Sequence, residues 1–158
     1  MPSHAIKIGK FYHAQNGATE HHTLNYSAEE FADLNLKGGV EVDASLIRVE
    51  EGIMLLIQGV KATQITPCAQ CGKSLEIPYE MDSSEWLFYE SKPLIYDDEN
   101  ESLFFDKQAM ELDPTEPVRQ ELILNEKILA RCPKACKKFK EAPEQAPKAL
   151  AGLKDLIQ

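Results

Sequence analysis

The chain contains 158 residues, of which 43% are hydrophobic, and this is enough for one domain with a buried core. Its 26 acidic and 17 basic residues give a formal net charge of −9. Because phosphate binding depends on lysine and arginine, this balance argues against a general RNA- or DNA-binding protein. An acidic surface suits a basic partner, although acidity also serves simply to keep a protein in solution.

The N-terminal segment carries weak structural signals. Residues 5–12 have the pattern of a strand, Asn16 and Gly17 form a turn signal, and residues 27–30 match a capping box at the start of a short helix. The four histidines have no constellation of ligand residues beside them, so we assign them no role. Residues 1–7 lack the apolar segment of an export signal, and no run approaches the length of a membrane span. We therefore expect a cytoplasmic location without membrane contact.

The middle of the chain predicts an antiparallel β-meander. Apolar and polar side chains alternate in residues 40–50, which is the period of a half-buried strand. A turn at Gly52 leads into residues 53–65, whose more continuous apolar run predicts a strand covered on both faces, with a bulge at Gly59. Residues 74–89 alternate again and supply the next strand.

The cysteines are the most informative residues of the chain. They form two close pairs, Cys68 with Cys71 and Cys132 with Cys136, and there are no others. Two thiolates separated by two or three residues can face one ion, so the grouping predicts two loops that meet around a tetrahedral metal. Gly72 can adopt a positive φ and turn the following amides toward sulfur. We interpret the four cysteines as ligands of one structural Zn²⁺ ion that clamps the end of a hairpin.

Three other interpretations of these cysteines remain open. A dithiol redox motif is one, but such motifs begin a helix in a βαβ unit, whereas Cys68 and Cys71 lie between two predicted strands. Disulfides are another, and they need an oxidising compartment. The third is four reduced thiols without any ligand, which accounts for each cysteine but not for the grouping.

An acidic stretch follows the predicted strands. Residues 97–101 read Asp-Asp-Glu-Asn-Glu after a proline. Carboxylates in a cluster can bind calcium, but the spacing of a calcium-binding loop is absent. We interpret the stretch as a solvated loop.

Residues 113–116 (Asp-Pro-Thr-Glu) predict the start of a helix, because aspartate caps a helix and proline suits its first turn. The helix is expected to run over residues 114–130, before Pro133. Helical periodicity places Val118, Leu122 and Leu129 on one face, which we expect to pack on the sheet.

Glu121 falls on the same face of this predicted helix, where a buried carboxylate needs a partner. It is either a general acid or base, or a structural carboxylate bonded to backbone amides, to Arg48 or to Arg119. We favour the structural role because no second catalytic residue accompanies it.

The C-terminal part predicts a basic segment, a linker with two prolines, and a short amphipathic helix over residues 148–158. This helix docks either on its own sheet or on a partner. The cations of the basic segment include Arg131, Lys134, Lys137 and Lys138. Together the patterns predict one α+β domain over residues 1–136, with an antiparallel sheet, a packed C-terminal helix and a zinc clamp made by the four cysteines, followed by a tail over residues 137–158.

Several of these motifs occur together in a known family. A hairpin with a cysteine pair, an aromatic strand, an acidic stretch, and the run Pro-Val-Arg-Gln-Glu-Leu-Ile-Leu before Cys-Pro-x-x-Cys resemble the YceD-like family over residues 40–136. Its members are also called large ribosomal RNA subunit accumulation proteins. In that family the first pair is Cys-x-Arg-Cys followed by an apolar residue, whereas Gln70 and Gly72 stand here. The family's Val-x-Glu-x-Leu-x-Leu helix has its glutamate one residue late, at Glu121.

The resemblance implies a non-enzymatic factor that supports accumulation of large-subunit ribosomal RNA, and hence ribosome assembly. We expect it to act through a basic ribosomal protein or a pre-ribosomal particle. The alternative is direct binding of ribosomal RNA through the basic patch near the second cysteine pair. We do not expect an enzyme, since no nucleophile, phosphate loop or carboxylate pair is recognisable.

Overall fold

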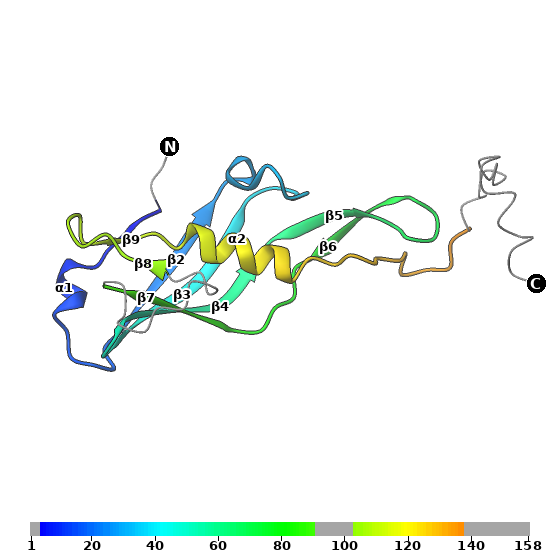
Figure 1. Cartoon of the computed structure of the whole chain (residues 1–158). Helices are drawn as coiled ribbons and strands as arrows, with labels where there is room; N and C mark the ends of the chain where they lie inside the picture. The colour runs from blue at the N-terminus through cyan, green and yellow to red at the C-terminus, as the bar shows by residue number, and fades with distance from the viewer. Residues whose placement is uncertain (1–3, 91–102, 138–158) are drawn as a thin grey trace, which may run out of the picture.

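The computed structural model describes residues 4–90 and 103–137. Its main element is a five-stranded sheet crossed by the helix α2 (Thr115–Leu124), and Figure 1 shows a two-stranded hairpin extending away from this body. The hairpin consists of β5 (Thr63–Pro67) and β6 (Ser74–Pro78). The strands of the sheet, in spatial order, are β2 (Thr19–Tyr26), β3 (Val40–Val49), β4 (Gly52–Lys61), β7 (Ser84–Tyr89) and β8 (Leu103–Phe104).

Short elements close one end of the body. The two-residue strands β1 (Ile6–Lys7) and β9 (Glu111–Leu112) pair with each other, and α1 (Gly9–Tyr12) follows β1 directly. The predicted strand over residues 5–12 is therefore wrong beyond its first residues. The capping box is confirmed at the 3-10 helix η1 (Ala28–Phe31), where the Ser27 N–H donates to Glu30 Oε2 at 2.7 Å.

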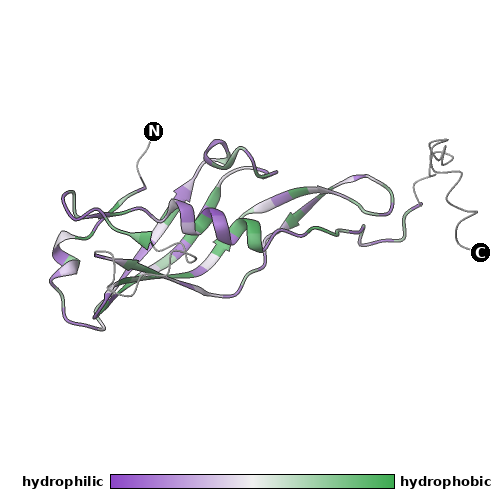
Figure 2. Ribbon diagram, viewed as in Figure 1, coloured by the Kyte–Doolittle hydropathy of each residue, from purple (hydrophilic) through white to green (hydrophobic). Residues whose placement is uncertain are grey.

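The predicted alternation in β3 and the predicted bulge are both confirmed. Val40, Val42 and Leu46 are buried, and Figure 2 shows hydrophobic residues concentrated on the strands that α2 crosses. Asp43 pairs with Gly59 while Ala44 pairs with Ile57, so β4 carries one extra residue at this point.

Two predicted strands are each divided in the structure. Residues 53–65 break at Ala62, so that β4 stays in the main sheet while β5 leaves it for the hairpin. Residues 74–89 likewise divide into β6, which pairs with β5, and β7, which pairs with β4. The alternation of apolar and polar side chains along a segment does not reveal which strand each half of it will pair with. The choice of pairing partner decides where one strand ends and the next begins.

The sheet is antiparallel except at one edge. β8 runs parallel to β7, with Phe88 opposite Leu103 and Tyr89 opposite Phe104. The expectation of a purely antiparallel sheet is thus wrong for this two-residue strand. The described residues form mostly antiparallel β-structure with α2 packed on it, in agreement with an α+β fold.

Helix α2 is shorter than predicted. Val118 and Leu122 are fully buried as expected, but the helix ends at Leu124, and Leu129 is 77% exposed instead of facing the sheet. The Asn125 side chain donates to the carbonyl oxygen of Glu121 at 2.9 Å, which satisfies a carbonyl of the last turn. The chain beyond Asn125 then follows β5 rather than the helix axis.

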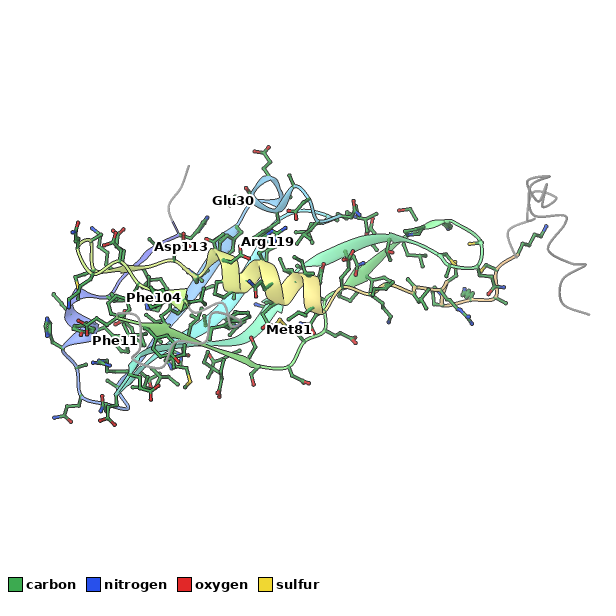
Figure 3. The ribbon with its side chains drawn as sticks, in the orientation of Figure 1. Phe11, Glu30, Met81, Phe104, Asp113 and Arg119 are labelled. Carbon is green, nitrogen blue, oxygen red and sulfur yellow. The ribbon has the colours of Figure 1, made fainter. Side chains whose placement is uncertain are left out.

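Glu121 has the partners that a buried carboxylate needs, but they differ from those that the sequence suggested. It is 7% exposed; its Oε1 accepts from the Trp86 indole N–H at 3.0 Å and its Oε2 from the Asn125 amide at 3.3 Å. Arg119 instead forms a salt bridge with Asp33, and Figure 3 shows it on the side of α2 where Glu30 lies.

Some predictions concern residues outside the described ranges. These are the acidic loop at residues 97–101 and the predicted tail, of which only Lys137 lies within the described ranges. The division into a domain over residues 1–136 and a tail therefore stays a prediction.

We predict that Gly52→Ala destabilises the protein by about 1–3 kcal/mol, because overpacking forces backbone shifts. A Cβ at Gly52 would lie 2.0 Å from the carbonyl oxygen of Phe88 in the adjacent strand β7. Gly59→Ala is the matched control, since a Cβ there meets no atom within 4 Å. Urea unfolding should separate the two variants, and equal stability would contradict the close approach of β4 and β7.

We also predict that Glu121→Ala lowers the free energy of unfolding by about 1–3 kcal/mol, because the half-buried Trp86 and Asn125 side chains each lose a hydrogen bond to a charged acceptor. Glu116→Ala, at an exposed position of the same helix, should change it by less than about 0.5 kcal/mol. Trp86 is the only tryptophan, so its fluorescence reports both unfolding and the local change. Similar losses in the two variants would contradict this role.

Candidate metal centre

The first cysteine pair lies in the turn at the end of the β5–β6 hairpin. The Cys68 N–H donates to the Lys73 carbonyl at 2.8 Å, and the Gly72 N–H donates to the Cys68 carbonyl at the same distance. Gly72 has a φ of 73°, in the left-handed region that glycine adopts without steric cost. This confirms the predicted conformation of Gly72 and places both thiols of the pair inside one tight turn.

The second pair reaches this turn because the chain after α2 follows the edge of β5. The Gln64 side chain, which is 4% exposed, accepts from the Lys127 N–H at 2.9 Å and donates to the Lys127 carbonyl at 3.1 Å. The Gln64 side-chain amide thus bonds to both backbone groups of Lys127, as the backbone of a neighbouring strand would. Further along, Cys68 and Ala130 form a parallel bridge, and the Ala69 N–H donates to the Ala130 carbonyl at 2.7 Å.

The four sulfur atoms converge, as the sequence predicted. All of them lie within 4.8 Å of one another, with Cys68 Sγ 3.8 Å from Cys136 Sγ and Cys71 Sγ 3.6 Å from Cys132 Sγ. Sulfurs at the corners of a tetrahedron with Zn–S bonds of about 2.3 Å are separated by about 3.8 Å. The thiols are free, and these separations are far longer than a disulfide bond of about 2.05 Å. The four thiols could therefore hold one tetrahedral metal ion.

Backbone amides point at one sulfur of the cluster. The N–H groups of Gln70 and Cys132 each donate to Cys68 Sγ at 3.4 Å. The Gln70 amide, with help from the amides of Cys71 and Cys132, lowers the pKa of the Cys68 thiol to about 6. Hydrogen bonding to Cys68 raises the pKa of the Cys132 thiol to about 12. Cys68 is thus prepared to act as a thiolate, which is the form that binds a metal.

Sequence reasoning missed two features of this centre. The amides that reach Cys68 come from Gln70 and Cys132, whereas we expected amides that follow Gly72. Gln64 was not singled out in the sequence, although it aligns the second cysteine loop with β5. Burial is the property that distinguishes Gln64, and one sequence does not reveal it.

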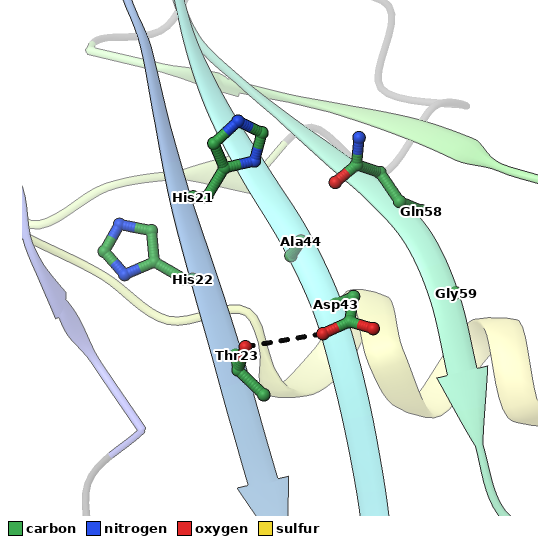
Figure 4. A pocket seen from close by; sticks show the side chains of 7 residues that line it. All are labelled: His21, His22, Thr23, Asp43, Ala44, Gln58 and Gly59. Carbon is green, nitrogen blue, oxygen red and sulfur yellow. Dashed lines mark hydrogen bonds between the residues drawn. The ribbon is translucent and has the colours of Figure 1, made fainter.

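The histidines do not belong to a second ligand cluster. His21 and His22 line an open hollow of about 340 Å³ with Asp43 and Gln58, shown in Figure 4. His21 Nδ1 lies 2.7 Å from Ser45 Oγ, and His22 lies 3.0 Å from a carboxylate oxygen of Glu20. Within residues 4–90 and 103–137, the four cysteines are the only group of three or more histidine, cysteine, aspartate or glutamate side chains whose ligand atoms converge.

The basic residues predicted as a possible RNA contact lie beside the cysteines. Arg131, Lys134 and Lys137 are exposed and flank Cys132 and Cys136 in the chain. The fourth residue of that prediction, Lys138, lies outside the described ranges.

Comparison with known proteins finds no match of any kind. No protein-family model matches the chain, no curated protein matches it, and no solved structure matches its fold. Among the described residues, no helix has the length and apolar character needed to cross a membrane. The resemblance based on sequence motifs therefore stays a prediction.

We predict that Gln64→Ala weakens metal binding about tenfold, as loss of residues that orient a metal site commonly does. Without the amide, the Lys127 backbone loses both partners that align the second cysteine loop with β5. The Kd for Zn²⁺ should be measured by competition with a chelator. Gln58→Ala, at an exposed position of β4, is the control and should leave the Kd unchanged. Equal Kd values would contradict the positioning role of Gln64.

Proposed function

We propose that Cys68, Cys71, Cys132 and Cys136 bind one Zn²⁺ ion whose role is structural. The convergence of four sulfurs at tetrahedral separations supports this proposal. Four thiolates fill the coordination sphere of zinc and leave no position for water or substrate, which is typical of structural rather than catalytic sites. Zinc would join the end of the hairpin to the chain beyond α2.

We further propose that the protein is a non-enzymatic interaction protein that supports accumulation of large-subunit ribosomal RNA during ribosome assembly. The support is the motif resemblance over residues 40–136 and the acidic character of the chain. Its partner in this proposal is a basic ribosomal protein within a pre-ribosomal particle.

An acidic hollow supports a basic partner. Glu80 and Asp82, in the connection from β6 to β7, line it together with Tyr79 and Asn125, and its volume is about 540 Å³. Both carboxylates are exposed, and neither forms a salt bridge within the described ranges. The charged group of a partner's lysine or arginine could pair with these two carboxylates, and the hollow has room for the aliphatic part of its side chain.

We predict about one zinc ion per chain in protein purified without chelators. Cys71→Ser should lose most of the metal and lower the melting temperature, because binding of structural zinc contributes directly to folding. Ser74→Ala, at the first residue of β6, should retain both metal and stability. Elemental analysis and thermal unfolding, with and without chelator, measure these quantities. A folded protein without metal, unaffected by chelator, would overturn the zinc proposal.

We predict that cells lacking this protein accumulate less large-subunit ribosomal RNA, while small-subunit RNA stays normal.

In RNase-treated extract, Glu80→Gln with Asp82→Asn should capture less basic ribosomal protein than the unmodified chain, because the acidic hollow loses its charge. Glu50→Gln with Glu51→Gln is the control, since it removes the same charge from the exposed β3–β4 turn. Normal large-subunit RNA in the deletion would reject the assembly role, and equal capture by both variants would reject this binding surface.

A further inference from the structure

Several basic side chains outside the cysteine region pair with carboxylates. In the body, Lys61 pairs with Glu41, Lys107 with Glu90, and Arg119 with Asp33. At the base of the hairpin, Lys37 Nζ lies 2.7 Å from a carboxylate oxygen of Glu76. These cations are neutralised within the protein.

The cations around the cysteines have no such partners. We use the name basic tip for the four exposed residues Lys73, Arg131, Lys134 and Lys137. In the part of the chain that the structure describes, none of them forms a salt bridge. Neither residues 62–75 nor residues 127–140 contain an aspartate or a glutamate. In a chain with a net charge of −9, this region carries only positive side chains.

The cysteine centre gathers these cations from two distant parts of the chain. Lys73 follows the first cysteine pair, and its carbonyl accepts from the Cys68 N–H. Arg131, Lys134 and Lys137 come directly before, between and after the second pair. Because the four sulfurs lie within 4.8 Å of one another, the two sets share one end of the molecule. A zinc ion with four thiolates carries a charge of roughly −2, which the four cations exceed.

We propose that the basic tip binds the phosphate backbone of RNA. This inference names a partner for the tip within the proposed assembly role, and it relies on the proposed zinc centre to hold the tip together. Three of the four residues are lysines, which bind phosphates as point charges without the fixed planar geometry of arginine. Such contacts follow the repeating backbone and carry little sequence information. The acidic body and the basic tip then suit a particle that offers both protein and RNA.

The test uses the purified full-length protein with its zinc content verified and a labelled single-stranded RNA of arbitrary sequence as the probe. Lys73→Gln with Lys134→Gln removes two cations of the tip. Lys7→Gln with Lys10→Gln is the matched control, because it removes the same charge from exposed positions at β1 and α1. All four cysteines remain, so both variants should keep their metal and stability.

For the tip variant we expect binding roughly 25-fold weaker at about 0.1 M salt, since each single-strand contact contributes about 0.7 to the salt exponent. The plot of log Kobs against log salt should be shallower by about 1.4, while the control variant should match the unmodified protein. Equal effects of the two variants, or binding that does not depend on salt, would overturn the proposal. So would displacement of the RNA by polyglutamate at equal charge, which would indicate an acidic protein as the partner.

The result is independent of the assembly role. RNA binding through the tip together with normal large-subunit RNA in deletion cells would support this inference and reject the assembly proposal. Loss of large-subunit RNA in deletion cells, with no difference between the two lysine variants, would support the assembly proposal and reject the inference.

Discussion

The alignment of residues 127–132 with β5 is the contact on which the cysteine centre depends. Gln64 binds both backbone groups of Lys127, and Ala130 then pairs with Cys68. These bonds carry the chain from the end of α2 to the end of the hairpin, where Cys132 meets Cys71. Without these bonds the two cysteine pairs would belong to separate loops, and each loop would supply only two of the four ligands of a tetrahedral site.

The hairpin needs this contact because it lacks an apolar core of its own. The buried residues of β5 and the turn are Gln64, Thr66 and Cys68, and none of them belongs to the hydrophobic core of the body. A two-stranded hairpin alone is at best marginally stable in water. Polar bonds from the chain after α2, and the zinc ion that we propose, would replace the packing that stabilises the main sheet.

The charged side chains also differ between the body of the protein and the cysteine end of the hairpin. Three cations of the body, Lys61, Lys107 and Arg119, pair with carboxylates. Within the described residues, the cations of the basic tip form no salt bridge. The net charge of −9 is a sum over the whole chain and does not show that one region is locally basic. For this reason net charge alone argued against RNA, while the arrangement of the charges supports a local RNA contact.

Much of the local structure was determined by the sequence itself. Alternation defined β3, glycine marked the bulge in β4, and the spacing of the cysteines predicted a centre between two loops. These features depend on short-range sterics and on the reach of neighbouring side chains.

Only the tertiary structure decided where elements stop and what buried polar groups bind. Helical periodicity continued to Leu129, yet the helix ends at Leu124, because the chain beyond it pairs with β5. One partner of Glu121 proved to be Trp86, which lies on a strand distant in sequence. The choice of pairing partner depends on every segment that competes for the same edge or donor, and such competition is settled only when the whole chain is packed.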